Sequence, residues 1–297
     1  MRIGFIGLGN MGGAMSANIV KKHPDRVYVF DIQEEKTHAL KRLGARVCAN
    51  CREIAGVSDL IITMLPRSEH VKSAWEEMLP EMGPGKFGID MSTIDPDVSV
   101  NIADMVKETG AEFADCPVVK SRDAAIAGNL GIFAGCSEET FREIEPILRY
   151  MGEQVIHMGE NGTGITMKIC QNALSHEIQA AVNETLTLAQ LNGIDVDTFA
   201  KAVSCGGARN YYLESKYRAI RDRDYTVAFP VEYALKDLKI CSRLSEKAAF
   251  PMPGLELAIG FLEKAVAMGY GKADNCACIE AVRKGTKLEA EAGKRYE

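Results

Sequence analysis

Three polar residues, Lys168, Asn172 and Ser175, are spaced so that they would share one face of a helix. Positions i, i+4 and i+7 of an α-helix point in nearly the same direction. A lysine whose pKa is lowered by partial burial can accept a hydroxyl proton and return it, as hydride transfer at a carbinol carbon requires. On spacing alone, the solvated stripe of an amphipathic helix is the commoner explanation. The three residues are therefore candidates for acid/base chemistry that need independent support.

A glycine motif near the start of the chain indicates a second kind of site. Gly7-Leu8-Gly9-Asn10-Met11-Gly12 has the form G-x-G-x-x-G, and it lies between a strand-like run and a helix-like run. In that context the first glycine permits a tight turn, the second lets the backbone approach a pyrophosphate, and the third allows close helix packing. The helix N-terminus then attracts the phosphates. The motif predicts a dinucleotide site that includes Asn10 and Met11.

Asp31 ends the second predicted strand, about twenty residues after the glycines, where an acidic side chain can bind the ribose hydroxyls. The same carboxylate would repel a 2′-phosphate. Ile32 and Gln33 follow it instead of arginine or lysine. The pattern therefore favours NAD over NADP, and the alternative is a solvated turn aspartate.

Short β-branched or apolar runs alternate with helical stretches over the first half of the chain, which indicates βαβ units on a parallel sheet. The Gly159–Gly164 stretch interrupts this pattern, and from Ile165 to Leu191 the apolar residues recur at helical spacing. We predict an α/β fold in which a Rossmann doubly wound parallel sheet (residues 1–161) is joined by a long interdomain helix to an all-α domain (residues 162–297). The predicted strands are 2–6, 27–30, 60–64, 87–89, 112–114 and 131–134, and the later helices are 196–203, 233–247 and 255–268.

Composition excludes several classes of protein. The net charge is -6, and lysines and arginines are interspersed with acids, so we expect no nucleic-acid partner. No apolar run approaches the ~20 residues of a membrane helix, and the chain opens with strand-like residues instead of a leader. The nine cysteines lack the spacing of a disulfide framework or a zinc site. We therefore expect a cytoplasmic protein with reduced thiols, no membrane partner and no metal.

Four ordered motifs make the chain resemble the β-hydroxyacid dehydrogenases, the family of 3-hydroxyisobutyrate dehydrogenase and tartronate semialdehyde reductase. The glycine motif with Met15 and Asn18 resembles the family's nucleotide signature. Asp90-Met91-Ser92-Thr93 resembles the family's fourth-strand motif. Gly162-Thr163-Gly164, followed by Lys168 and Asn172, resembles its catalytic segment. Lys236-Asp237-Leu238 resembles its late lysine motif.

The resemblance implies a role for each matching residue. Lys168 would be the general acid/base, and Asn172 would orient the substrate. Leu65, Thr93 and Lys236 would line the nicotinamide end of the cofactor site. Without the resemblance, a core leucine, a strand-end cap and a solvated helix face would explain these last three residues.

The chain departs from the family in the substrate loop. Asp115-Cys116-Pro117-Val118 matches the family's signature, but Val119-Lys120-Ser121 replaces the usual Ser-Gly-Gly. A lysine in place of a glycine could bind a strong anion by charge-assisted hydrogen bonds. In this respect the loop resembles that of the sulfolactaldehyde reductases. We therefore hypothesise that Lys120 and Ser121, with Asn172 and Ser175, hold a sulfonate; the alternative is an exposed loop lysine.

Three functions follow as expectations. The first is NAD-dependent interconversion of 3-sulfolactaldehyde and 2,3-dihydroxypropane-1-sulfonate. The second is the same reaction on a carboxylate, such as succinic, methylmalonic or tartronate semialdehyde or 3-hydroxyisobutyrate. The third is an NAD-binding regulatory module without turnover, against which the joint presence of Lys168 and Asn172 argues. The long helix and the resemblance also predict a homodimer or homotetramer.

Overall fold

The computed structural model describes residues 1–289 of the 297-residue chain. They form two compact units, the first from Met1 to Lys168 and the second beginning at Ile169. The break between the units therefore falls inside a helix, α8 (Thr163–Leu191). The sequence-based boundary after residue 161 stays a prediction. No helix within residues 1–289 has both the length and the apolarity to cross a bilayer.

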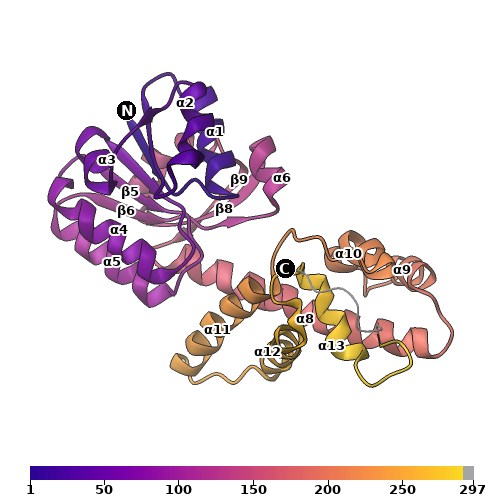
Figure 1. Cartoon of the computed structure of the whole chain (residues 1–297). Coiled ribbons are helices and arrows are strands. Elements are labelled where there is room, and N and C mark those ends of the chain that lie inside the picture. The colour runs from indigo at the N-terminus through magenta and orange to yellow at the C-terminus, as the bar shows by residue number, and fades with distance from the viewer. Residues whose placement is uncertain (290–297) are drawn as a thin grey trace. The chain divides into compact units, whose positions relative to one another are not determined.

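The first unit is built on a sheet with helices packed around it (Figure 1). The sheet has nine strands in the order β3-β2-β1-β4-β5-β6-β8-β7, with β9 beside β8. All neighbours from β3 to β6 pair in parallel, whereas β8 runs antiparallel to β6 and β7. The predicted Rossmann fold is confirmed, and the order of its first five strands is the usual β3-β2-β1-β4-β5. The strands are β1 (Ile3–Ile6), β2 (Val27–Phe30), β3 (Arg46–Val47), β4 (Leu60–Thr63), β5 (Phe87–Asp90), β6 (Glu112–Asp115), β7 (Val118–Val119), β8 (Leu130–Gly135) and β9 (Gly152–Gly159).

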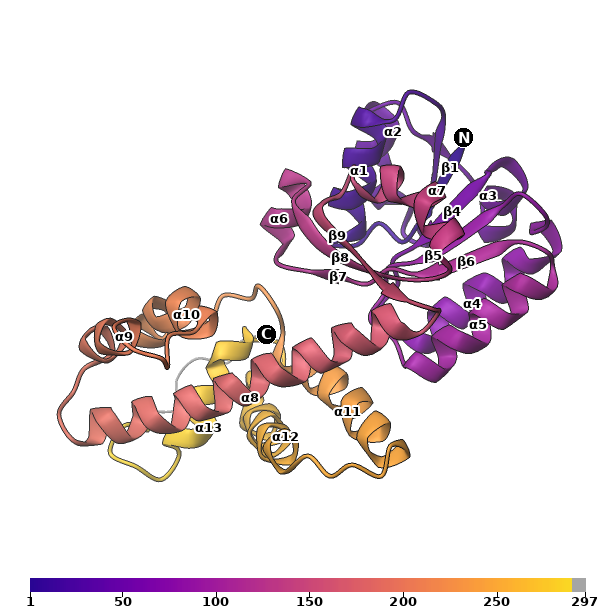
Figure 2. The same ribbon diagram turned by 180° about the vertical axis from the view of Figure 1, so that it is seen from behind.

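Helices cover both faces of this sheet, and this explains why its central strands are mainly apolar and end in buried polar residues. On β4, Leu60 and Ile62 pack into one core while Ile61 packs into the other. The first core also contains side chains of α1, α2, α6 and α7, and the second contains side chains of α3, α4 and α5. The arrangement of these helices around the sheet can be followed in Figure 2. These helices are α1 (Gly12–Lys22), α2 (Thr37–Arg42), α3 (Cys51–Val57), α4 (Ser68–Met78), α5 (Pro96–Glu108), α6 (Arg122–Ala127) and α7 (Glu138–Leu148).

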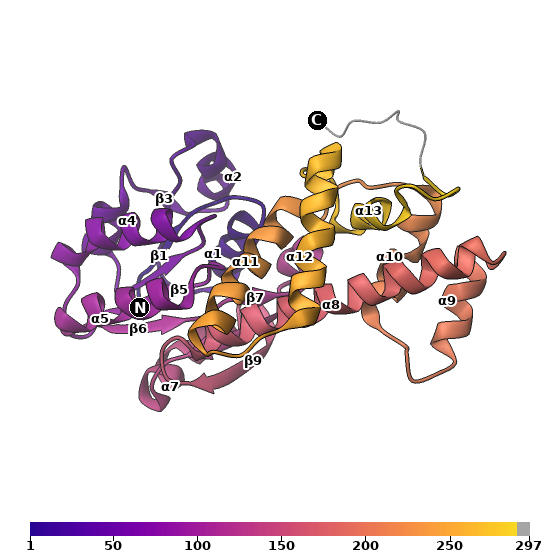
Figure 3. The same cartoon turned by 90° about the horizontal axis from the view of Figure 1, so that it is seen from below.

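The second unit is helical, as predicted. Most of α8 belongs to it, and α9 pairs with α10 while α11 pairs with α12 (Figure 3). One of its cores joins Leu186 of α8 to Val196 of α9, Ile220 of α10 and the segment from Ala273 to Ile279. The remaining helices are α9 (Val196–Ser204), α10 (Tyr211–Asp222), α11 (Val231–Lys247), α12 (Pro253–Ala265) and α13 (Ile279–Arg283).

Candidate active site

The carboxyl ends of β1, β2, β4 and β5 bring several candidate residues to one edge of the sheet. These strands are adjacent and parallel, so the segments that follow them emerge at the same edge, where ligands of such folds bind. The glycine turn follows β1 and Asp31 follows β2, while Leu65 and Thr93 follow β4 and β5 within three residues. One edge of the first unit thus carries every predicted cofactor-binding residue except Lys236.

The glycine turn between β1 and α1 has three sterically different glycines. Gly7 has a φ of 92°, which favours glycine, and a side chain there would collide with the backbone of Met64. A Cβ on Gly12 would strike the carbonyl oxygen of Gly7. At Gly9, by contrast, an added Cβ would meet no atom within 4 Å. The backbone at Gly9 is therefore open to a close approach from outside the protein, as a pyrophosphate requires.

Asp31, which directly follows β2, stabilises this turn through hydrogen bonds. Its Oδ2 accepts a hydrogen bond from the N–H of Leu8 at 2.7 Å, and its Oδ1 accepts one from the N–H of Gln33 at 2.8 Å. The Lys36 ammonium lies 3.9 Å from Oδ1. Lys36 was not among the residues predicted from the sequence, because it does not directly follow Asp31 as Ile32 and Gln33 do. A cation at this position reduces the repulsion that Asp31 would exert on a 2′-phosphate.

A buried network holds the segments of Leu65 and Thr93 together. The hydroxyls of Thr63 and Ser92 donate to Oδ1 of Asp90 at 2.7 and 2.6 Å, and the N–H of Leu65 donates to the Ser92 hydroxyl at 2.8 Å. Asp90 is 2% exposed. Burial raises its pKa from 3.8 to about 6, although the hydrogen bonds from Ser92 and Thr63 lower it. Asp90 is thus the common acceptor that ties the end of β4 to the end of β5.

The raised pKa of Asp90 predicts a pH dependence of stability. Because its pKa is higher in the folded than in the unfolded chain, the folded protein binds more protons between the two values, and the stability contributed by this group falls as pH rises toward about 6. Asp90→Asn keeps an oxygen acceptor but does not titrate. We expect the free energy of unfolding of the wild type, relative to this variant, to fall by about 1 kcal/mol from pH 5 to pH 8. Urea denaturation at both pH values measures this. If the difference in unfolding free energy between the wild type and Asp90→Asn were the same at pH 5 and pH 8, the raised pKa of Asp90 would be contradicted.

Lys120 and Ser121 lie in the loop between β7 and α6, where both serve the local structure. Lys120 has a φ of 83°, a conformation that favours glycine. Its ammonium donates to the carbonyl oxygen of Asn129 at 2.6 Å, and the Ser121 hydroxyl caps α6 by accepting from the N–H of Ala124. The amide of Asn18 on α1 donates to the carbonyl oxygen of Ala125 at 2.8 Å. Helix α6 is therefore tied to the helix that follows the glycine turn.

Helix α8 carries candidates in both units. Lys168 is the last residue of the first unit, and Asn172 and Ser175 belong to the second. The Asn172 amide donates to Oδ2 of Asp237 on α11 at 2.7 Å, while the Lys236 ammonium lies 3.3 Å from Oδ1 of the same carboxylate. Asp237 is 3% exposed. The structure thus brings Asn172 and Lys236 to one buried carboxylate, a partner that sequence reasoning missed although it adjoins Lys236.

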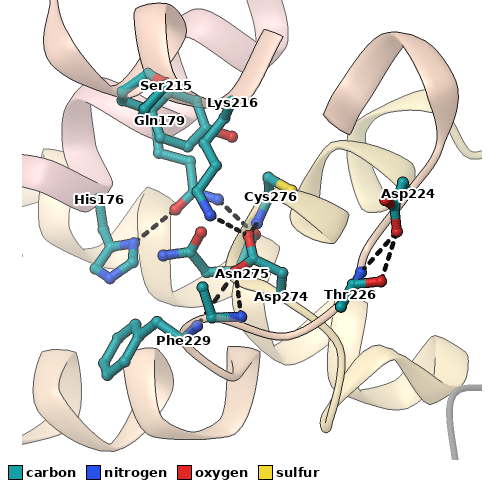
Figure 4. A network of polar contacts seen from close by, with 12 residues as sticks. His176, Gln179, Ser215, Lys216, Asp224, Thr226, Phe229, Asp274, Asn275 and Cys276 are labelled. Atoms are coloured by element: carbon teal, nitrogen blue, oxygen red, sulfur yellow. Dashed lines mark hydrogen bonds and ion pairs between the residues drawn. The ribbon is translucent and has the colours of Figure 1, made fainter. Parts of the chain in front are cut away.

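A second polar network stabilises the loop that leads into α11. Asp274, which is 1% exposed, accepts hydrogen bonds from the Lys216 ammonium at 2.8 Å and from the backbone N–H groups of Ala228 and Phe229 (Figure 4). His176 contacts Gln179 at 2.6 Å and stacks near Phe229. The network fixes the residues just before α11, which carries Lys236 and Asp237. His176 is a packed residue of this network.

Two family profiles match the chain, one over each half. The profile of the NAD binding domain of 6-phosphogluconate dehydrogenase matches residues 2–159. The profile described as the NAD-binding domain of NADP-dependent 3-hydroxyisobutyrate dehydrogenase matches residues 162–282.

Individual relatives resemble the chain over nearly its whole length. The 2-(hydroxymethyl)glutarate dehydrogenase of Eubacterium barkeri is 31% identical over 99% of both chains. The glyoxylate/succinic semialdehyde reductase 1 of Arabidopsis thaliana is 31% identical over 95% of this chain and 99% of its own. A structure of the 3-hydroxyisobutyrate dehydrogenase of Mycobacterium tuberculosis with L-serine superposes with a TM-score of 0.89 at 26% identity, covering 95% of this chain and 99% of that one.

Proposed function

Because the chain belongs to the 3-hydroxyisobutyrate dehydrogenase group of the β-hydroxyacid dehydrogenase family, we propose that it interconverts a small anionic semialdehyde and its hydroxy acid. The chain is an NAD(P)-dependent oxidoreductase acting on CH–OH groups. The observation that carries the proposal is that Lys168 belongs to the same compact unit as the glycine turn. A proton donor on that unit keeps a constant relation to the dinucleotide that the turn binds.

Lys168 is the general acid/base of the proposed mechanism. The dinucleotide, when bound, supplies or accepts the hydride. In the reductive direction, the Lys168 ammonium donates a proton to the carbonyl oxygen of the aldehyde as that oxygen gains negative charge. In the oxidative direction, the neutral amine takes the proton of the substrate hydroxyl. Asn172 orients the substrate oxygen through its amide, and the bond to Asp237 limits the rotation of that amide.

The cofactor of the proposal is NAD. The turn of Gly7, Gly9 and Gly12, with Asn10 and Met11, accommodates the pyrophosphate, and the open position at Gly9 supports this fit. Asp31 receives the adenosine ribose. Leu65, Thr93 and Lys236 contact the nicotinamide end. Lys36 beside Asp31 is the observation that favours NADP instead, so both dinucleotides belong in any kinetic comparison.

The finer proposal for the substrate is 3-sulfolactaldehyde, with Lys120 and Ser121 as the residues that bind its sulfonate and Asn172 and Ser175 beside them. A lysine held at a φ of 83° supports this role, because residues in sparsely populated backbone conformations cluster at functional sites. A carboxylate substrate is the second candidate. The names of the relatives favour it, since 2-(hydroxymethyl)glutarate and succinic semialdehyde carry carboxylates.

Lys120→Gly separates the two candidates. Glycine accepts the φ of 83° without strain, so we expect the variant to fold like the wild type. If Lys120 binds the sulfonate, kcat/KM for 2,3-dihydroxypropane-1-sulfonate falls about 10- to 100-fold, the value of a charge-assisted hydrogen bond. The kcat/KM for 3-hydroxyisobutyrate, measured in parallel, changes less. Equal changes for both substrates, or none, would remove the sulfonate from the proposal and leave the carboxylate.

The proposed assembly is a homodimer or homotetramer. Leu174 and Leu188 on α8 are 59% and 62% exposed, and their separation of 14 residues, close to four helical turns, places them near one face of the helix. Large exposed apolar side chains on one helix face are typical of a subunit interface. We propose a reducing compartment, the cytoplasm, on the basis of the nine cysteines; several relatives are mitochondrial by name.

A further inference from the structure

Asp115 ends β6 and is buried, with 1% of its surface exposed. Its Oδ1 accepts a hydrogen bond from the N–H of Gly162 at 2.7 Å, and its Oδ2 accepts one from the N–H of Ile165 at 2.7 Å. Both N–H groups belong to the start of α8, where backbone donors lack acceptors within the helix. A carboxylate there also interacts favourably with the positive end of the helix dipole. Asp115 therefore caps α8 from a neighbouring strand.

Close backbone packing reinforces this cap. A Cβ on Gly164 would lie 2.5 Å from the carbonyl oxygen of Phe133 and 2.6 Å from that of Asp115. A Cβ on Gly135 would lie 2.6 Å from Oδ1 of Asp115 and 2.7 Å from the N–H nitrogen of Gly164. Both glycines are thus required for α8 to reach the ends of β6 and β8. The Asn161 amide adds hydrogen bonds to the carbonyl oxygens of Phe113 and Gly135 at 2.8 and 3.0 Å.

We propose that Asp115 is the positioning residue for Lys168: its carboxylate fixes the first turn of α8 to the sheet and thereby fixes the lysine on the cofactor-binding unit. Lys168 follows Ile165 by three residues, about 4.5 Å along the helix axis. No flexible joint separates the cap from the lysine, because residues 163–168 are continuous helix. The inference rests on the role of Lys168 in the proposed function.

A helix cap that serves stability alone can be supplied by a side chain next to the helix in the sequence. Helices α3, α5 and α9, for example, are capped by the nearby side chains of Asn50, Asp95 and Asp195, each of which accepts from one backbone N–H group. Asp115 differs from these three caps because it binds two N–H groups at once and belongs to a strand that lies 47 residues before Gly162 in the chain. Burial raises the pKa of Asp115 from 3.8 to about 7, against the lowering effect of the two hydrogen bonds. Burial of an ionisable carboxyl group costs folding free energy. Its presence at this point therefore indicates that a fixed position of α8 on the sheet is important to the protein.

The test compares Asp115→Asn with a matched control, Asp195→Asn. Asparagine keeps one acceptor oxygen and loses the other, while its size is unchanged. Asp195 caps α9 by accepting from the N–H of Thr198, and α9 carries none of the candidate site residues. Three quantities are measured for the full chain: amide hydrogen exchange over residues 160–170, the dissociation constant of the dinucleotide, and the pH profile of kcat.

If Asp115 positions Lys168, amide exchange over residues 160–170 becomes faster in Asp115→Asn and kcat falls about 100-fold, the cost of a 1 Å misplacement. The dinucleotide dissociation constant stays unchanged, because the glycine turn is intact, and the lysine limb of the pH profile shifts. The control changes none of these quantities. If Asp115→Asn does not fold, Asn161→Ala tests the same turn through the hydrogen bonds to Phe113 and Gly135 and should lower kcat by a smaller factor.

Two outcomes overturn the inference. Faster amide exchange with an unchanged kcat and pH profile would show that the cap is only structural, while the proposed function stands. A proportional loss of kcat and dinucleotide binding would likewise indicate a general structural role. Failure of the proposed function is recognised by a different variant. If Lys168 is not the acid/base, Lys168→Ala retains turnover, whichever kcat is measured for Asp115→Asn.

Discussion

Lys168→Ala lowers kcat by about 100- to 10,000-fold on every hydroxy acid that the wild type oxidises, because a positioned acid/base contributes a factor of this size. The dinucleotide dissociation constant is expected to stay close to that of the wild type, since Lys168 lies outside the glycine turn. Lys168→Arg should fail to restore turnover, because a guanidinium does not release its proton at neutral pH. Steady-state kinetics and equilibrium binding measure the two effects independently.

The matched control is Lys107→Ala, which removes a lysine from the last turn of α5, outside every candidate site. We expect it to leave kcat unchanged. The assigned mechanism would be wrong if Lys168→Ala kept its turnover, or if it lost turnover only because the dinucleotide no longer binds.

Two alanine substitutions in the glycine turn should have opposite consequences. Gly12→Ala places a Cβ against the carbonyl oxygen of Gly7 and 3.2 Å from the ring of Phe5, so it should destabilise the folded unit by about 1–3 kcal/mol or more. Gly9→Ala meets no atom of the protein within 4 Å, so its stability should equal that of the wild type. Its Cβ instead occupies space needed by the pyrophosphate, and we expect dinucleotide binding to weaken roughly 10- to 100-fold. Thermal unfolding without cofactor and dinucleotide titration separate the two effects.

Each of the two variants serves as the control for the other. Wild-type dinucleotide binding by Gly9→Ala would contradict the placement of the pyrophosphate at this turn. Wild-type stability of Gly12→Ala would contradict the contact between the start of α1 and the turn.

The central strands could be predicted from the sequence because they are buried on both faces. Every residue of β1 and β4 is buried, and apart from Thr63 at the end of β4 each strand appears as an apolar run. The strand β9 was not predicted, because Glu153, Gln154 and the partly exposed Ile156 give it no apolar periodicity. The two-residue strands β3 and β7 were too short to show any pattern. Edge strands of this kind are defined by pairing with a neighbour, which a single segment does not reveal.

The helices of the second unit show the same limit. Helix α8 was predicted almost to its ends, because its apolar residues recur over many turns. Helix α10 was missed, since only Leu213 and Ile220 of its twelve residues are buried and five are charged. The available signal was Asn210, whose side chain accepts from the N–H of Leu213 as an N-cap.

The candidate site was predictable where a local motif defines it and not where distant segments meet. The glycine turn and Asp31 lie in one βαβ unit, and the structure joins them through the bond from Leu8. The buried acids Asp90, Asp115 and Asp237 received no individual role from the sequence. Each has a hydrogen-bond partner far along the chain, 27, 47 and 65 residues away, in Thr63, Gly162 and Asn172. Such pairs are set by the tertiary fold, which no spacing rule describes.

The most direct test of the central claim is the initial rate of wild-type oxidation of a small panel of anions, with NAD and with NADP. The panel contains 2,3-dihydroxypropane-1-sulfonate, 3-hydroxyisobutyrate, 4-hydroxybutyrate and glycerate, and formation of the reduced dinucleotide is followed by absorbance. We predict turnover of a small anionic hydroxy acid, faster with NAD than with NADP, and fastest for the sulfonate. Absence of turnover of all four anions with both dinucleotides, in a protein that binds a dinucleotide, would contradict the proposed substrate class.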